Sequence, residues 1–441
     1  MTTAATPART TAPTTGGSAD ARWWIHEPGV TFLNHGSFGG CPAAVLETQA
    51  AWRARLEAEP VRFFGEDLFG LLDWVRGDVA GFLGCDPGGL VFVPNATTGV
   101  ATVLANLDLR AGDEILLTDH EYPACANNLR HVAAQSGATP VAATLPFPDP
   151  TPDAIVEAVL GRVTERTRAA LISHITSASA MVLPVERLVP ELERRGVRTI
   201  VDGAHVPGHL PLDLDALAPS YYTGNLHKWV CSPKGSAVLG VREDHRDNFR
   251  PMVLSNMAEQ PPADRPRLHT EFDYVGTQDP TAVLTVPAAL RIMAAIARSE
   301  PPRRSPAAEL PPDGVLDEAW STIRERNRAL AVEGRRIVCD ALEAAPPVPD
   351  EMTACIALIA LPPHDDDARA RLEARPTRYH DALQDALLAR HRIQVPVHSI
   401  PGPGGRVRCV RISAQLFNTR EQYAALAEAL REELRRERGG G

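Results

Sequence analysis

Three side chains suited to one kind of chemistry lie close together near the middle of the sequence. Asp202 ends the apolar run TIVD, His205 follows it, and Lys228 lies in the segment LHKWV. A lysine amine can form an imine with an aldehyde cofactor, and an aspartate facing a pyridinium nitrogen keeps that ring protonated, which makes it a stronger electron sink. The apolar neighbours of Lys228 would lower its pKa and favour the free amine. A helix-capping aspartate and a surface lysine would show the same letters, so their positions in the fold are decisive.

Strand-like and helix-like segments alternate around these residues. Short apolar runs predict strands at 89–94, 113–118, 139–145, 168–175, 197–205 and 235–241. Amphipathic segments predict helices at 100–107, 125–135, 152–163 and 186–196. This alternation indicates crossover connections and a mainly parallel sheet, an α/β architecture. Asp202 and Lys228 would then lie at one edge of the sheet, where α/β folds place their chemistry.

The flanking segments predict further helices and a smaller second domain. Helices are expected at 43–59 (opened by Pro42), 66–84, 279–298, 317–344, 378–390 and 419–436, and strands at 353–361 and 406–413. Prolines and charges around 301–314 are typical of a linker or surface insertion. We predict a disordered tail over 1–20, an N-terminal segment over 21–60 that joins the small domain, a large domain over 61–300, the linker over 301–314 and a small α+β domain over 315–441.

The composition excludes several classes of function. A net charge of -10 argues against a nucleic-acid partner, because phosphate binding needs a concentrated positive face. No apolar run approaches the ~18 residues of a membrane span, and the N-terminal residues lack the apolar core of a signal peptide, so we expect a cytoplasmic protein. The seven cysteines are scattered without CxxC spacing, which predicts buried free thiols and no metal site.

The segment PNATTG follows an expected strand and precedes a helical pattern. Small hydroxylated residues at a helix N-terminus offer free N–H groups and the favourable end of the helix dipole. Ala96, Thr97 and Thr98 are therefore candidates for a phosphate seat. An ordinary helix cap by Asn95 or Thr97 is the alternative.

Arg411 lies in VRISAQLFNT near the C-terminus, and strand alternation directs it to the same side as Ser413. A guanidinium binds a carboxylate through two parallel hydrogen bonds, so a fixed arginine can orient an amino-acid substrate. A solvated surface charge is the alternative, since arginine is abundant in this chain.

Seven motifs in consistent order resemble the class V aminotransferase family of pyridoxal-phosphate enzymes, and most closely its isopenicillin N epimerase-like branch. They are LNHGSFG, PNATTG, DHEY, VDGAHVPG, TGNLHKW, GTQDPT and VRISAQLFNT, and they cover about residues 30–435. Each is weak alone, but a chance match to all seven is implausible. The resemblance implies the PLP-dependent fold type I, with a mainly parallel seven-stranded sheet in a large domain, a smaller α+β C-terminal domain and pyridoxal 5'-phosphate as cofactor.

The resemblance also implies roles around the cofactor ring. Lys228 would carry the cofactor, Asp202 would face the pyridine nitrogen, and His205 would lie near the ring oxygen. In DHEY one side chain would cover the ring, and we favour Tyr122, because an aromatic plane can stack on the pyridine face. His120 is the second possibility, and a tyrosine that serves packing alone is the other interpretation.

Asn225 and His227 would add phosphate contacts by the same resemblance, although many members have serine where Asn225 stands. GTQDPT resembles the segment that crosses to a neighbouring subunit, where Thr277 would touch the partner's cofactor phosphate. This implies a homodimer with shared active sites. A Gly-Thr turn that caps the next helix would look the same.

The remaining motifs imply substrate contacts. LNHGSFG would fold over the mouth of the site, so that Asn34, His35 and Ser37 contact the substrate, while Arg411 binds its carboxylate. The same letters of LNHGSFG would also serve an ordinary turn.

In every reaction of this kind the freed Lys228 acts as the base at the substrate Cα. Reprotonation on the opposite face, with Tyr122 as a candidate donor, gives an epimerase, which is the prediction. Loss of a β-substituent gives a lyase and protonation at the cofactor carbon an aminotransferase, and both are alternatives. A cysteine desulfurase is disfavoured because Cys409, the thiol upstream of Arg411, shares its strand. A non-catalytic ligand-binding scaffold would not need these residues as a set.

Overall fold

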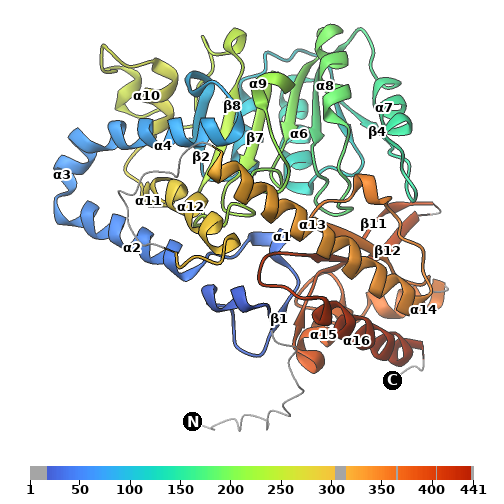
Figure 1. Ribbon diagram of the computed structural model, residues 1–441. Helices are drawn as coiled ribbons and strands as arrows, with labels where there is room; N and C mark the ends of the chain where they lie inside the picture. The colour runs from blue at the N-terminus through green and yellow to red at the C-terminus, as the bar shows by residue number, and fades with distance from the viewer. Residues whose placement is uncertain (1–16, 303–313, 364–365, 404, 439–441) are drawn as a thin grey trace, which may run out of the picture.

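A seven-stranded sheet forms the centre of the larger part of the molecule (Figure 1). In this computed structural model, which describes residues 17–302, 314–363, 366–403 and 405–438, the strand order is β2-β8-β7-β6-β5-β3-β4. β8 is antiparallel to both neighbours, and all other pairs are parallel. The strands are β2 (Leu90–Val93), β3 (Glu114–Thr118), β4 (Thr139–Ala143), β5 (Thr167–Ser173), β6 (Arg198–Asp202), β7 (Tyr221–Asn225) and β8 (Ala237–Val241).

The sheet is covered on both faces, as expected for parallel strands that are apolar throughout. Adjacent residues of β6 show this directly, because Ile200 and Val201 belong to two different buried apolar clusters. One cluster includes residues of α5 (Ala96–Ala105) and α6 (Pro123–Ser136). The other includes residues of α7 (Pro152–Leu160), α8 (Val185–Arg194) and α12 (Val286–Ala297).

A second, three-stranded antiparallel sheet follows in the C-terminal part, in the order β11-β12-β9. The long helix α13 (Val315–Leu342) contacts both α12 and α16 (Arg420–Arg438), and Figure 1 shows it running between the large sheet and the C-terminal elements. The N-terminal strand β1 (Thr31–Phe32) pairs with β10 (Ile393–Gln394), so the start of the chain joins the C-terminal part. The other strands are β9 (Ile356–Ala360), β11 (Val397–Gly402) and β12 (Gly405–Ser413).

Further helices connect these layers. They are α1 (His35–Phe38), α2 (Ala43–Ala58), α3 (Pro60–Arg62), α4 (Leu68–Leu83), α9 (Leu214–Leu217), α10 (Arg267–Asp273), α11 (Thr281–Leu284), α14 (Asp366–Glu373) and α15 (Ala382–His391). Among the residues that the structure describes, no helix combines the length and apolar character that a bilayer span requires.

The predicted fold class is confirmed, and each predicted strand overlaps a strand of the structure. β7 was not among the predicted strands, and the helix expected over 279–298 is divided at Thr285 into α11 and α12, with Pro287 in the first turn of α12. Most of the predicted tail (1–16) and of the predicted linker (303–313) lies outside the described residues. The division of the chain into domains stays a prediction.

A buried ion pair ties the edge strand β2 to its covering helices. Arg76 of α4 is 2% exposed, and its guanidinium donates to the Leu90 carbonyl and to the Asp273 carboxylate of α10, both at 2.6 Å. Arg265 also binds Asp273. Removal of Asp273 would leave the buried Arg76 with only the half-exposed Asp73 carboxylate, 3.6 Å away, as counter-charge, which is expensive.

We therefore expect Asp273→Ala to lower the free energy of unfolding by about 3–5 kcal/mol in a urea titration. The matched control is Arg53→Ala, because the Arg53–Asp279 pair at 2.8 Å is 57% and 45% exposed, and loss of an exposed pair costs less than about 1 kcal/mol. Equal effects of the two substitutions would contradict this interpretation of the pair.

Candidate active site

Asp202 ends β6 and lies at the carboxyl edge of the sheet, beside the end of the parallel strand β7. Its side chain is 3% exposed; Oδ1 accepts from the Ala204 N–H at 2.9 Å and Oδ2 from the Cys125 thiol at 3.2 Å. Burial raises the pKa of Asp202, while these two donors and the charge of Lys228 act against that rise. The carboxylate is thus fixed in place by neutral donors.

Lys228 follows β7 at the same edge, with Nζ 3.1 Å from Nε2 of His205. Burial, followed by the positive charge of Arg411, lowers the pKa of Lys228 to about 7, although the charge of Asp202 opposes the shift. Burial also lowers the pKa of His205 well below its usual value, so this imidazole is neutral. About half of the lysine is therefore free amine at neutral pH, and nearly all of it is about one pH unit higher.

The N-terminal segment around α1 fastens the Lys228 loop to the C-terminal part. His35 is fully buried, and its Nε2 donates to the Lys228 carbonyl at 3.0 Å. The Gly36 N–H donates to Ser413 Oγ at 3.0 Å, and Arg411 donates to Ser37 Oγ at 2.8 Å. Asn34 accepts from the Ser37 hydroxyl at 2.5 Å. The predicted substrate residues Asn34, His35, Ser37 and Arg411 are thus brought together beside Lys228.

Arg411 of β12 is a buried cation, 5% exposed, without a carboxylate partner among the described residues. It donates to the Ser177 carbonyl and to Ser37, while its Nε has no hydrogen-bond partner in this part of the chain. Burial lowers the pKa of Arg411 to about 10. Since an unpaired buried charge is costly, this guanidinium is suited to receive an anion from a ligand.

The predicted phosphate seat begins α5, and two of its three N–H groups already have partners. Asn95 caps the helix by accepting from the Thr98 N–H at 2.8 Å, and Asn225 accepts from the Ala96 N–H at 2.9 Å. The Thr97 N–H has no partner among the described residues. The Nδ1–H of His227 donates to the Ser236 carbonyl at 3.0 Å. The structure therefore brings Asn225 to the start of α5, with Thr97 as the open donor.

Three other residues predicted for the site, Tyr122, His120 and Thr277, differ from one another in exposure and in hydrogen-bond partners. Tyr122 precedes α6, is 42% exposed and is close enough to Arg411 to affect the pKa of that guanidinium. His120 is buried, with its Nδ1 2.8 Å from Ser179 Oγ and its Nε2 without a hydrogen-bond partner among the described residues. Thr277 lies between α10 and α11, with its hydroxyl 3.3 Å from that of Tyr274.

Sequence reasoning missed three residues of the site. Ser177 follows β5 and accepts from Arg411, Cys125 holds Asp202, and Trp229 donates its indole N–H to His205 Nδ1 at 3.4 Å. A position after a parallel strand could have indicated Ser177. A stronger signal for the lysine was also missed: of the 45 Lys and Arg residues only Lys228 and Lys234 are lysines.

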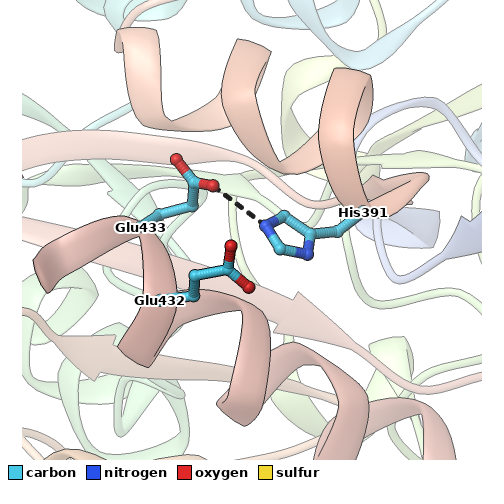
Figure 2. A group of neighbouring side chains, drawn as sticks. All are labelled: His391, Glu432 and Glu433. Atoms are coloured by element: carbon cyan, nitrogen blue, oxygen red, sulfur yellow. Dashed lines mark hydrogen bonds and ion pairs between the residues drawn. The ribbon is translucent and has the colours of Figure 1, made fainter. Parts of the chain in front are cut away.

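A separate group of possible metal ligands, His391, Glu432 and Glu433, joins α15 to α16 (Figure 2). His391 Nε2 lies 2.9 Å from Glu433, which also receives two hydrogen bonds from Arg390 at 3.0 and 2.6 Å. Arg436 pairs with Glu432 at 2.6 Å. Because two guanidiniums already neutralise these carboxylates, we assign the group to helix packing.

Comparison with known proteins gives a consistent result. Residues 42–304 match the family model of class V aminotransferases. The chain is 34% identical to isopenicillin N epimerase of Amycolatopsis lactamdurans, over 92% of this chain and 96% of that protein. It is 29% identical to putative L-cysteine desulfhydrase 2 of Oryza sativa subsp. japonica, over 92% and 85%. A lysine-to-alanine mutant of C-DES with glycine covalently linked to its PLP cofactor has the same fold, with a TM-score of 0.71, 22% identity and coverage of 94% and 99%.

The lowered pKa of Lys228 makes its reactivity depend on pH in a defined way. We expect the rate of its acetylation by acetic anhydride, in cofactor-free protein, to rise up to about pH 7 and to level off about one unit above that value. Mass spectrometry of the same sample also measures the acetylation of Lys234, which serves as an internal reference for the reagent. A rate for Lys228 that keeps rising to the usual lysine pKa of about 10.4 would contradict the lowered value.

Proposed function

Because this chain belongs to the class V aminotransferase family of pyridoxal-phosphate enzymes, we propose that it binds this cofactor at Lys228. The observation that carries the proposal is a lysine whose pKa is lowered to about 7 and which lies near a buried carboxylate, Asp202, and a buried guanidinium, Arg411, neither of which forms an ion pair with it or with the other. Lys228 would bind the aldehyde of the cofactor, Asp202 its ring nitrogen, and Arg411 a substrate carboxylate.

Several residues fit the other parts of the cofactor. When bound, the cofactor supplies an electron sink for a carbanion at the substrate Cα. Asp202 would hold the ring nitrogen protonated, and His205 would donate to the ring oxygen. The phosphate would meet the open N–H of Thr97, with the remaining predicted contacts from Ala96, Thr98, Asn225, His227 and, across a homodimer, Thr277 of a second copy.

Arg411 would orient the substrate. Its guanidinium is fixed by Ser37 and Ser177 and keeps an unpartnered Nε, so an incoming carboxylate would supply the missing negative charge. Asn34 and His35 lie on the same segment and would close the site over the substrate. The proposed substrate class is therefore an α-amino acid or a molecule derived from one.

Lys228 would move the proton at Cα. An amine with a pKa of about 7 accepts a proton readily at neutral pH and returns it as readily, which suits a general base. His205 lies within 3.1 Å of the amine and steers it. This proton transfer precedes every reaction outcome considered below.

We favour epimerisation at Cα. The identity of 34% to an isopenicillin N epimerase over nearly the whole length of both proteins supports this outcome. A second proton donor is needed on the face opposite Lys228, and Tyr122, partly exposed and close to Arg411, is the candidate. Its phenol would deliver the proton that inverts the configuration.

β-Elimination from cysteine or a related molecule is the second candidate, because the chain is also 29% identical to a putative L-cysteine desulfhydrase. Elimination needs the same lysine and arginine and no second proton donor. Sulfur transfer through a cysteine thiolate is not favoured, since Cys409 is fully buried within β12 and burial raises its pKa to about 12. Transamination remains the third outcome of the same proton transfer.

Incubation with isopenicillin N or L-cysteine in deuterated water distinguishes these outcomes. We expect deuterium at Cα with inverted configuration and no requirement for a keto acid. Release of pyruvate and sulfide would assign a lyase, and dependence on an added keto acid would assign an aminotransferase.

The matched variants for this experiment are the two lysines of the chain. Lys228→Ala should lower the exchange rate by about 10³-fold or more, because it removes the general base. Lys234→Ala, which loses a hydrogen bond to the Gly39 carbonyl at 3.1 Å, should exchange at nearly the wild-type rate. Equal exchange by the Lys228→Ala variant and the wild type would contradict the role of Lys228.

A further inference from the structure

Trp229 is the buried residue next to Lys228, and its indole N–H has a directed partner. The ring is 1% exposed and packs against His209 in a tilted arrangement, with ring centroids 4.1 Å and planes 36° apart, and it meets His35 edge to face at 5.0 Å. Its Nε1–H donates to His205 Nδ1 at 3.4 Å. An indole nitrogen can only donate, so His205 Nδ1 must accept.

This direction fixes the tautomer of His205. A neutral imidazole carries one proton, so a ring whose Nδ1 accepts must carry its proton on Nε2. That Nε2 lies 3.1 Å from Lys228 Nζ. The hydrogen bond can form only when the amine offers its lone pair, because an ammonium group has donors alone. The arrangement thus favours the uncharged lysine.

The indole ring itself is held by partners that cannot change direction. His209 Nε2 accepts from the Cys355 N–H at 2.6 Å, so its Nδ1–H donates to the His205 carbonyl at 2.9 Å. On the other side, His35 donates to the Lys228 carbonyl. Backbone groups therefore fix which ring nitrogen of each histidine donates, and the indole packs between these two rings.

We propose that Trp229 is a positioning residue that, through the tautomer of His205, keeps the Lys228 amine uncharged and ready to react with an aldehyde. This inference rests on the proposed function in one respect: the proposed cofactor supplies the aldehyde with which the free amine would react. The titratable or charged groups that face His205 and Lys228 from the surrounding elements are Asp202, Cys125, His35, His209 and Arg411. None of them accounts for the direction of the His205 hydrogen bond.

The direct test is Trp229→Phe, which keeps an aromatic ring against His209 and removes the N–H. His205 Nδ1 then loses its donor, the other tautomer becomes accessible, and its Nε2 can accept from a Lys228 ammonium. We expect the midpoint of Lys228 acetylation against pH to move upward by about one unit, the size of one hydrogen bond. Acetylation of Lys234, read in the same peptide, should not change.

Trp52→Phe is the matched control. Trp52 is 2% exposed, and its indole N–H has no hydrogen-bond partner among the described residues. This substitution therefore removes a buried N–H that does not fix the tautomer of any histidine. Its Lys228 profile should coincide with that of the wild type. A Trp229→Phe profile that coincides with the wild type, or an equal shift in Trp52→Phe, would overturn the proposal.

A second measurement keeps the proposal testable if Trp229→Phe does not fold. Nitrogen-15 NMR of histidine-labelled wild-type protein, with His205→Asn used for assignment, reports the tautomer of His205 directly. Protonation at Nε2 is expected, and protonation at Nδ1 would overturn the proposal. Both measurements use the full-length chain without cofactor. A chain that binds no cofactor but shows the expected shift would refute the proposed function and leave this inference standing.

Discussion

A charged group that is buried away from water must pair with an opposite charge or lose its own charge. This constraint applies to all the ionisable groups around Lys228. At two other sites of the described chain the constraint is met within the protein: Arg76 pairs with Asp273, and Arg408 binds Asp381 and Glu437. Arg411 has no such partner among the residues that the structure describes. The lysine responds with a lowered pKa, and the arginine keeps a positive charge that an anionic ligand can balance.

The fold produces this arrangement by bringing distant parts of the sequence to one edge of a sheet. β6 and β7 are parallel neighbours, so Asp202 and the Lys228 loop emerge side by side. α1 then links that loop to β12 through His35, Gly36 and Ser37. Any reaction at this edge thus depends on contacts between the first and last parts of the chain. Only a lysine can serve at position 228, because a guanidinium is never neutral under these conditions.

Much of this organisation could be predicted from the sequence because apolar runs and capping residues report local structure. The alternating pattern gave six of the seven strands of the large sheet. β7 was missed because its sequence YYTGN ends in polar residues that resemble a turn. Long-range pairing has no such local signal: the contact of Asn225 with the Ala96 N–H occupies a donor that the helix start alone would leave free. For the same reason Cys125 and Trp229 could not be recognised, since each acts through a partner far away in the sequence or through the direction of one hydrogen bond.

The central claim is that the aldehyde of pyridoxal phosphate condenses with Lys228, and reduction by borohydride followed by peptide mass spectrometry tests it most directly. Freshly purified protein should be yellow, lose its visible absorption on reduction, and carry the reduced cofactor on Lys228 and not on Lys234, which lies six residues further along the chain. Colourless protein that takes up no cofactor when it is added, or a label on Lys234, would contradict the account.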